Sequence, residues 1–106
     1  MKFAVAGLLL DACVLGELSS APAYGYELTQ KTQNLLDISE SALYPVLRRL
    51  QKEDFLVTYD EAIDGRNRRY YQITEKGRES LQEYKDDWWK YKKSIDTFLK
   101  GGNKGE

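Results

Sequence analysis

The fold of this chain is decided by residues 38–52, ISESALYPVLRRLQK, and by the residues that follow as far as Ile73. Within residues 39–52 apolar side chains recur every three or four positions, which predicts a helix with one buried face. That face consists of Leu43, Val46, Leu47 and Leu50. The opposite face carries Ser41, Tyr44, Arg48 and Lys52. Such side chains can bind phosphates and base edges, although a solvated helix face carries the same residue types.

Two segments rich in β-branched and aromatic residues follow this helix, at 55–60 and 68–74. Asp64 and Gly65 lie between them, which predicts a hairpin, with a loop somewhat longer than the tightest kind. Residues 66–78 hold five basic side chains and one acidic side chain, a local charge of +4 in a chain of net charge −1. A helix with a polar outer face followed by a basic hairpin is typical of a recognition helix and its wing.

Composition restricts the classes of function. With 106 residues, of which 42% are hydrophobic and 31% charged, the chain predicts one globular domain with a single core. It has one cysteine and no histidine, so neither an internal disulfide nor a zinc site is expected. The sequence also has no histidine base, no glycine-rich phosphate loop and no distinctive carboxylate pair. We therefore expect no enzymatic activity, no metal and no other cofactor.

The amino-terminal segment loosely imitates a signal peptide, because Lys2 precedes an apolar run that leads to Cys13. Asp11 interrupts that run just before the cysteine, and the apolar pattern continues to Leu18. We therefore expect a cytoplasmic protein without a membrane partner, and no stretch approaches the roughly 20 apolar residues of a membrane span. Residues 3–18 instead predict a helix that is apolar almost all round and buried on more than one side, with Cys13 as a small buried side chain.

The next segment, Ser-Ser-Ala-Pro at residues 19–22, is expected to end the first helix, because proline and its predecessor disfavour helical backbone. A second helix is predicted from Tyr24 to Asn34, and Ser39 is expected to cap the third. The second and third helices form a helix-turn-helix pattern. Pro45 removes one hydrogen bond from the third helix, so either its first turn is irregular or it bends there.

A fourth helix is predicted from Thr74, its N-cap, to about Leu99, where glycines follow. Its apolar side chains alternate spacings of three and four, which is typical of helices that pack along one stripe. We call this stripe the carboxy-terminal seam, and it consists of Leu81, Tyr84, Trp88, Tyr91, Ile95 and Phe98. We expect the seam to pack against the first helix, partly across a dimer axis. Trp89, one position off the seam, is expected to cover the edge of the first helix.

Four blocks occur in order along the chain: YGYEL at 24–28, residues 39–50 around Leu43-Tyr44-Pro45, GRNRRYY at 65–71 and ITEKG at 73–77. Together they resemble the PadR-like family of bacterial transcriptional regulators, specifically its small members with one carboxy-terminal helix. The resemblance covers about residues 8–99, and the Ser-Ser-Ala-Pro insertion departs from the family pattern. It implies a winged helix-turn-helix, a homodimer, and repression of nearby genes that a small molecule relieves.

The expected fold is therefore mainly α with a small β-hairpin. A winged helix-turn-helix would occupy residues 1–74, with the wing at about 55–74, a dimerisation helix would occupy 75–100, and a flexible tail 101–106. Two such units should read a pseudo-palindromic operator in double-stranded DNA with half-sites about 34 Å apart. The third helix would enter the major groove, and the wing would hold phosphates or the neighbouring minor groove. The candidate DNA-contacting residues are Tyr24, Ser39, Ser41, Tyr44, Arg48, Arg66, Asn67, Arg68 and Arg69.

Trp88 has two interpretations, since a tryptophan on the seam is usually a core residue. The family resemblance, counted from Gly77, instead places it where multidrug-responsive members have an aromatic that stacks on planar drugs at the dimer interface. In that case a small aromatic effector would bind a pocket of Trp88, Tyr91, Leu15 and Leu18. The expected dimer interface comprises Leu8, Leu81, Tyr84, Trp88, Tyr91, Ile95 and Phe98. The alternative function is a winged-helix dimer that binds a protein and has no effector site.

Overall fold

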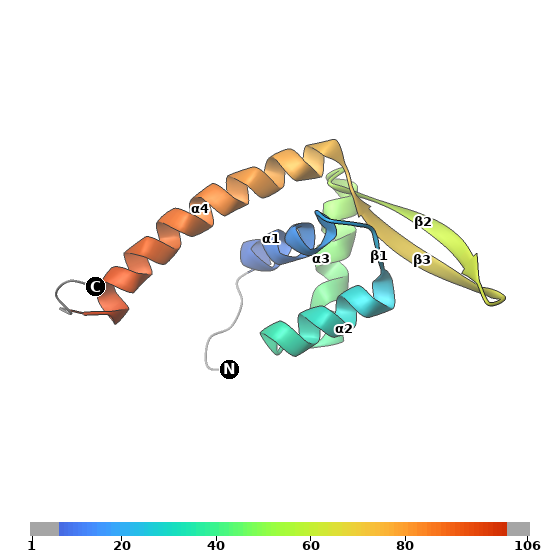
Figure 1. Ribbon diagram of the computed structural model, residues 1–106, viewed down its shortest axis with the longest axis horizontal. Coiled ribbons are helices and arrows are strands. Elements are labelled where there is room, and N and C mark those ends of the chain that lie inside the picture. Colours follow the sequence, from blue (N-terminus) through green and yellow to red (C-terminus); the bar gives the residue numbers. More distant parts are fainter. Residues whose placement is uncertain (1–6, 102–106) are drawn as a thin grey trace.

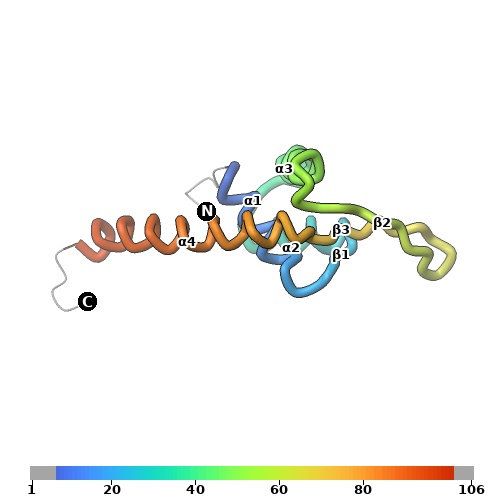
Figure 2. The backbone as a smooth tube through the Cα atoms, turned by 90° about the horizontal axis from the view of Figure 1, so that it is seen from above, coloured from blue at the N-terminus to red at the C-terminus, as the bar shows by residue number. Residues whose placement is uncertain are grey.

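The computed structural model describes residues 7–101. Three helices, α1 (Gly7–Leu18), α2 (Gly25–Leu36) and α3 (Glu40–Lys52), form a central body with two arms that point in opposite directions (Figure 1). One arm is the hairpin of β2 (Leu56–Ile63) and β3 (Arg66–Ile73), and the other is the long helix α4 (Glu75–Leu99). Viewed from above, α3 lies to one side of the line that joins the two arms (Figure 2). The predicted winged helix-turn-helix, mainly α with a small hairpin, is confirmed.

The core lies where the three body helices meet the inner face of the sheet and the first turns of α4. The four apolar residues predicted for the inner face of α3 are all buried there. Helix α1 ends at Leu18, as predicted, whereas its predicted start at Phe3 lies outside the described residues. Cys13 is exposed, contrary to the prediction, because its neighbours Val14 and Leu15 occupy the inward face of α1.

A short strand that the sequence did not predict, β1 (Ala23–Tyr24), lies between α1 and α2. It pairs antiparallel with β3, Ala23 opposite Tyr71 and Tyr24 opposite Tyr70, and gives the sheet the order β1-β3-β2. The second helix, predicted to begin at about Tyr24, has this residue as its N-cap, and the pairing with β3 holds it in extended backbone. Helix α2 begins one residue later and ends at Leu36, two residues beyond the predicted Asn34.

The hairpin loop has only two residues, Asp64 and Gly65, so the predicted longer loop is wrong. Both residues have positive φ, 51° and 76°. A two-residue loop with two left-handed positions matches the right-handed twist of the flanking strands, and Asp-Gly suits it well. The strands consequently reach Ile63 and Arg66, and the pairing register is fixed along their whole length.

Two helix ends position the wing and α4. At the end of α3, Asp54 has φ 65°, and the Phe55 N–H donates to the Leu50 carbonyl at 2.9 Å. This is a Schellman motif, and it turns the chain directly into β2. At the start of α4, the predicted N-cap Thr74 is confirmed, because its Oγ1 accepts from the Gly77 N–H at 2.9 Å.

Pro45 lies inside α3, and the helix continues through it from Glu40 to Lys52. In the first turn the Ala42 N–H donates to the Ser39 carbonyl at 3.1 Å, a bond that spans three residues instead of four. Such a bond is usual for the N–H groups of a first turn, which have no partner four residues back in the helix. Ser39 is the N-cap in backbone conformation, but its hydroxyl makes no capping bond.

Candidate nucleic-acid interface

The outer face of α3 carries the predicted polar stripe. Ser41, Tyr44, Arg48 and Lys52 are all exposed, on the side opposite the core. Ser39 and Ser41 lie together at the start of the helix, with their hydroxyl oxygens 3.1 Å apart. The stripe is therefore a continuous polar surface along the helix. It belongs to the element that projects from the line joining the arms (Figure 2).

Glu40 is a residue of this surface that the sequence analysis missed. Its carboxylate accepts a hydrogen bond from the Tyr44 hydroxyl at 3.4 Å. A carboxylate in the first turn suits the helix dipole, which is the signal that could have identified it. On a nucleic-acid interface such a group accepts from a cytosine amine and repels phosphates. Glu40 therefore places a carboxylate at the amino-terminal end of the polar stripe.

A hollow of about 410 Å³ separates α3 from α2 and β3. It brings together three predicted residues from three elements, Tyr24, Tyr44 and Arg69, and adds Gln30. Tyr71 forms part of its wall, and burial raises the pKa of this phenol. The hollow is thus lined by groups that donate and accept hydrogen bonds, next to the polar stripe of α3.

The folded wing is not the basic hairpin that the sequence predicted. The hairpin with its loop, residues 56–73, contains three arginines and three acidic residues, so its net charge is zero. The predicted excess in residues 66–78 combined the three arginines of β3 with Lys76 and Arg78 of α4. It left out the acids that precede residue 66, namely Asp60 and Glu61 of β2, opposite Arg69 and Arg68, and Asp64 of the loop. The Asp60 carboxylate accepts from Arg69 Nε at 3.5 Å and from Asn67 Nδ2 at 3.4 Å. Two of the predicted contact residues are thus held by an internal acid.

The four predicted wing residues divide between the two faces of the hairpin, because successive strand side chains alternate. Asn67 and Arg69 share the face of the buried Tyr71, whereas Arg66 and Arg68 share the other. The Arg68 guanidinium lies over the Tyr24 ring, 4.9 Å from its centroid. A cation–π contact of this kind fixes a guanidinium while leaving its N–H groups free to donate.

The other two cations of the basic window, Lys76 and Arg78, belong to α4 and not to the wing. Arg78 Nη1 donates to the Ser19 carbonyl at 2.9 Å, just beyond the end of α1. Lys76 Nζ lies 5.6 Å from the centroid of the Phe55 ring. Both side chains therefore connect α4 to the body.

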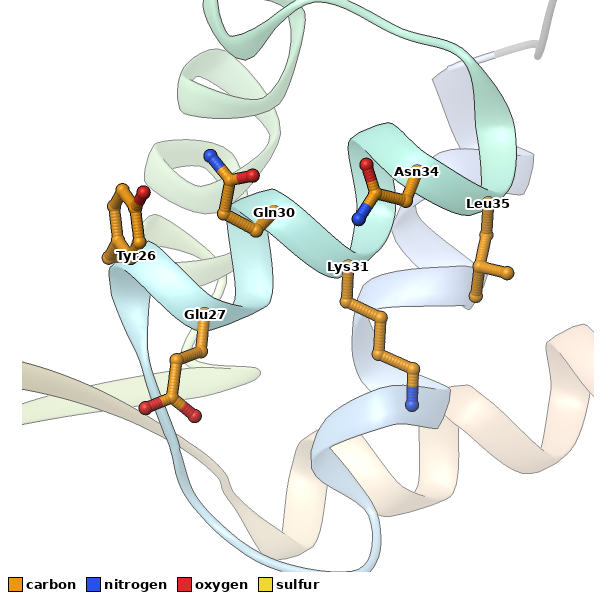
Figure 3. A pocket seen from close by; sticks show the side chains of 6 residues that line it. All are labelled: Tyr26, Glu27, Gln30, Lys31, Asn34 and Leu35. Atoms are coloured by element: carbon orange, nitrogen blue, oxygen red, sulfur yellow. The ribbon is translucent and has the colours of Figure 1, made fainter.

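A second hollow, about 470 Å³, runs along the exposed side of α2 (Figure 3). All six lining residues come from this one helix, so the hollow is an open strip and not a cleft between elements. Tyr26 and Gln30 also line the hollow beside α3. Lys31, which lies between Gln30 and Asn34 on this strip, pairs with Glu17 of α1 at 2.8 Å. None of the predicted contact residues lies here.

Two adjoining hollows, of about 500 and 420 Å³, lie between α1 and α4. They share Leu9, Ala12, Tyr84 and Trp88, and Tyr91 lines the larger one. We call them together the aromatic hollow. The structure brings the predicted pair Trp88 and Tyr91 together here, with ring centroids 6.2 Å apart.

Leu15 and Leu18 do not line the aromatic hollow, so this part of the predicted pocket is wrong for the single chain. They are 0% and 1% exposed, because the face of α1 that carries them points into the core. Leu9 and Ala12 occupy the face that meets α4. An all-apolar helix gives no sequence signal for which of its faces meets which neighbour.

The carboxy-terminal seam divides into two parts. Leu81 is buried and Tyr84 is partly buried against the core of their own chain, as expected of a seam that packs on α1. Beyond them the apolar side chains are uncovered, from Trp88 at 44% exposed to Phe98 at 80%, and Leu8 of α1 is also exposed. Trp89 does not cover α1 as predicted, because it is 60% exposed with Lys93 Nζ over its ring.

A buried carboxylate joins three helices behind these surfaces. Asp11 of α1 forms an ion pair with Arg49 of α3, and it accepts from the Tyr84 hydroxyl of α4 at 3.5 Å. Burial raises the pKa of Asp11, and the Arg49 guanidinium opposes that effect only in part. Burial also raises the pKa of Tyr84, and the neighbouring carboxylate adds to it. The signal in the sequence was an acid that interrupts the apolar run of α1.

Within residues 7–101, no cluster of three or more acidic, cysteine or histidine side chains could hold a metal ion. None of the helices in this range is long and apolar enough to cross a membrane.

Comparison with known proteins places this geometry among regulators of transcription. The sequence profile of the transcriptional regulator PadR-like family matches residues 14–83. The solved structure of smu.1704 from Streptococcus mutans is 34% identical, covers 100% of both chains and superimposes with a TM-score of 0.88. A PadR-like transcriptional regulator of Bacillus cereus is 36% identical, with 88% of this chain and 93% of that one covered and a TM-score of 0.79. The transcriptional regulator Rv3488 of Mycobacterium tuberculosis is 35% identical over 71 residues, 66% of either chain.

Proposed function

Because the chain belongs to the PadR-like family of transcriptional regulators, we propose that it is a homodimeric repressor that binds double-stranded DNA and is released by a small aromatic effector. The family consists of regulators and not of enzymes, in agreement with the sequence analysis. The observation that carries the proposal is the difference between the two faces of α3. One of its faces is buried in the core, and the other is an exposed stripe of hydroxyl, aromatic and cationic side chains.

Helix α3 is the element that enters the major groove. A helix fits this groove, and its exposed side chains then reach base edges. Ser39, Ser41 and Tyr44 lie at the amino-terminal half, where recognition helices make base contacts, and Arg48 follows one turn later. Arg48 donates either to a guanine edge or to a phosphate.

The wing contributes backbone contacts through the arginines that its own acids do not hold. Arg66 lies at the tip, directly after the two-residue loop, and Arg68 is fixed over Tyr24. Arg69 and Asn67 each donate to Asp60 through one nitrogen, so only their remaining N–H groups are available to DNA. Since the net charge of the wing is zero, its affinity for phosphates depends on this placement and not on an overall positive potential.

The uncovered part of the seam supports the homodimer. Trp88, Tyr91, Ile95 and Phe98 leave an apolar surface along α4, with the exposed Leu8 on neighbouring α1. Contiguous apolar surface of this kind marks an interaction site. A second copy of α4 would cover it, and a twofold axis through such an interface would present two α3 helices to one pseudo-palindrome.

The aromatic hollow supports the effector part of the proposal. It is concave and mostly apolar, and Tyr84 and Tyr91 supply phenol hydroxyls beside the Trp88 ring. Planar aromatic ligands stack on such rings and hydrogen-bond to such hydroxyls. A bound ligand weakens DNA binding only if it favours a dimer geometry in which the two α3 helices are wrongly spaced.

DNA binding is tested by titrating duplex DNA from the region upstream of the protein's own gene at several salt concentrations. Counterion release predicts a fall in affinity of about 10³-fold or more between 50 and 200 mM salt if about six phosphates are contacted. A protein-binding module would show no such dependence. Replacing Arg66 and Arg68 together with alanine should weaken binding to all sequences alike, whereas Tyr44→Ala should reduce discrimination between operator and unrelated DNA. Unchanged binding in both variants would contradict the proposed interface.

A further inference from the structure

The most unusual group outside the DNA surface is the carboxylate of Asp11. Its residue is 3% exposed, in a helix whose other inward side chains are apolar. One carboxylate oxygen pairs with Arg49 of α3, and the other accepts from the Tyr84 hydroxyl of α4 at 3.5 Å. These partners lie 38 and 73 residues away in sequence. A single side chain therefore connects three helices.

The two partners also belong to two different surfaces. Arg49 directly follows Arg48 in α3, so its position is tied to the orientation of the DNA-facing stripe. Tyr84 lines both parts of the aromatic hollow, one helical turn before Trp88. A group that enters the hollow against Tyr84 therefore acts on a side chain whose hydroxyl is bonded to Asp11.

The chemistry of Asp11 requires that its carboxylate keep its hydrogen-bond donors. An ionised carboxylate is only an acceptor, so it needs donors at its two oxygens when water is excluded. A buried charge that loses a partner is costly, and the remaining structure readjusts to restore one. Displacement of the Tyr84 hydroxyl would leave one Asp11 oxygen without that donor, and the carboxylate would turn or shift together with Arg49.

We propose that Asp11 is a positioning residue that links the aromatic hollow to helix α3, through Tyr84 on one side and Arg49 on the other. The inference rests on the proposed function, because it assumes that α3 binds DNA. It adds the route by which events in the hollow reach α3. A carboxylate that merely held α1 against α3 would need Arg49 alone, and the bond to Tyr84 would have no effect on DNA binding.

The link is tested without knowledge of the effector, because coupling between two sites is reciprocal. If the hollow acts on α3, DNA bound to α3 must change the surroundings of Trp88. The parent protein for the experiment is Trp89→Phe, in which Trp88 is the remaining tryptophan of the chain. Trp88 emission is recorded while duplex DNA from the region upstream of the protein's own gene is added, and DNA binding is measured in parallel by anisotropy of labelled DNA.

We expect the emission of Trp88 to change on DNA binding in this parent. In the additional variant Tyr84→Phe, which keeps the ring and removes only the hydroxyl, DNA should still bind but the emission change should be lost. The DNA dissociation constant should shift by roughly 2- to 30-fold, the range of mutations that alter coupling. Tyr59→Phe on the wing, which removes a phenol hydroxyl far from Asp11, is the matched control and should retain the response. Asp11→Asn should behave like Tyr84→Phe.

The outcomes separate this inference from the proposed function. DNA binding without any Trp88 response in the parent would overturn the link while leaving the repressor proposal intact. A response that persists in folded Tyr84→Phe would also overturn it. Failure of the parent to bind any DNA would overturn the proposed function, and this inference with it. Circular dichroism of each variant establishes that it is folded, and Tyr84→Phe provides the decisive comparison if Asp11→Asn does not fold.

Discussion

Gly77→Ala should destabilise the protein, because the first turn of α4 packs against the backbone of Phe55, the residue just before β2. A Cβ atom at Gly77 would lie 2.3 Å from the Phe55 carbonyl oxygen and 2.8 Å from Ile73 Cγ1. The Phe55 carbonyl cannot move freely, since it accepts from the Thr74 N–H at 3.0 Å and its own N–H is bonded to α3. The methyl group must therefore separate α4 from the start of the wing.

The magnitude follows from two opposing effects. Overpacking of this kind costs about 1 to 3 kcal/mol, and occasionally more. Alanine in place of glycine inside a helix stabilises the helix by up to about 1 kcal/mol. We therefore expect Gly77→Ala to lower the free energy of unfolding by about 1 to 2 kcal/mol, or the Tm by about 5 to 15 °C for a domain of this size.

Gly16→Ala provides the matched control, because Gly16 also lies inside a helix but a Cβ atom there meets nothing within 4 Å. It should gain about 0.5 to 1 kcal/mol from helix propensity alone. Thermal unfolding of both variants and the wild type should be followed by circular dichroism at one protein concentration, since the Tm of a protein that dimerises depends on its concentration. A Gly77→Ala protein as stable as Gly16→Ala would refute the packing argument.

Three further predictions concern charge and assembly. Asp60→Asn should free Arg69 and raise the affinity for DNA severalfold. In salt titrations, the slope of log affinity against log salt concentration should steepen by about 0.9 for one more phosphate contact. Unchanged affinity would mean that Arg69 never reaches DNA. The pKa of Asp11 is raised in the folded protein, where Arg49, Tyr84 and Glu53 face its carboxyl group. The wild type should therefore lose stability relative to Asp11→Asn as pH rises from about 3.8, the unfolded value, through the folded pKa, and the difference should then level off. Parallel curves of stability against pH for the two proteins would argue against the raised pKa. Phe98→Glu should place a charge in the uncovered seam and shift sedimentation from dimer to monomer, whereas an unaltered dimer would move the interface elsewhere.

The sequence predicted the helices well because their signals are local. The spacing of Leu43, Val46, Leu47 and Leu50 identified the buried face of α3, and the opposite stripe is exposed. Thr74 marked the start of α4, and the segment that leads to the proline at residue 22 marked the end of α1. Each of these signals comes from residues within a turn or two of one another, so it survives without knowledge of the rest of the chain.

The errors concern partners that are distant in sequence. Strand β1 is two residues long, and it is a strand only because β3 lies beside it. The charge of the wing was counted over residues 66–78, and the hairpin is neutral because Asp60 and Glu61 of the paired strand and Asp64 of the loop balance the three arginines of β3. The turn dipeptide Asp64-Gly65 already favoured a two-residue loop, and such a loop fixes which residues of β2 and β3 pair. In this case a local signal in the sequence was sufficient to predict the pairing.

By itself, then, the sequence determined which helices form, that a hairpin follows the third of them, which face of each amphipathic helix is buried, and the order of blocks that indicates the family. Only the tertiary structure decided which face of the uniformly apolar α1 meets α4, that Leu15 is core and Ala12 lines the hollow, and that Asp11 joins Arg49 to Tyr84. The physical reason is range. Periodicity and capping act over one or two turns of chain, whereas burial and ion pairing depend on neighbours that packing brings together from 38 or 73 residues away.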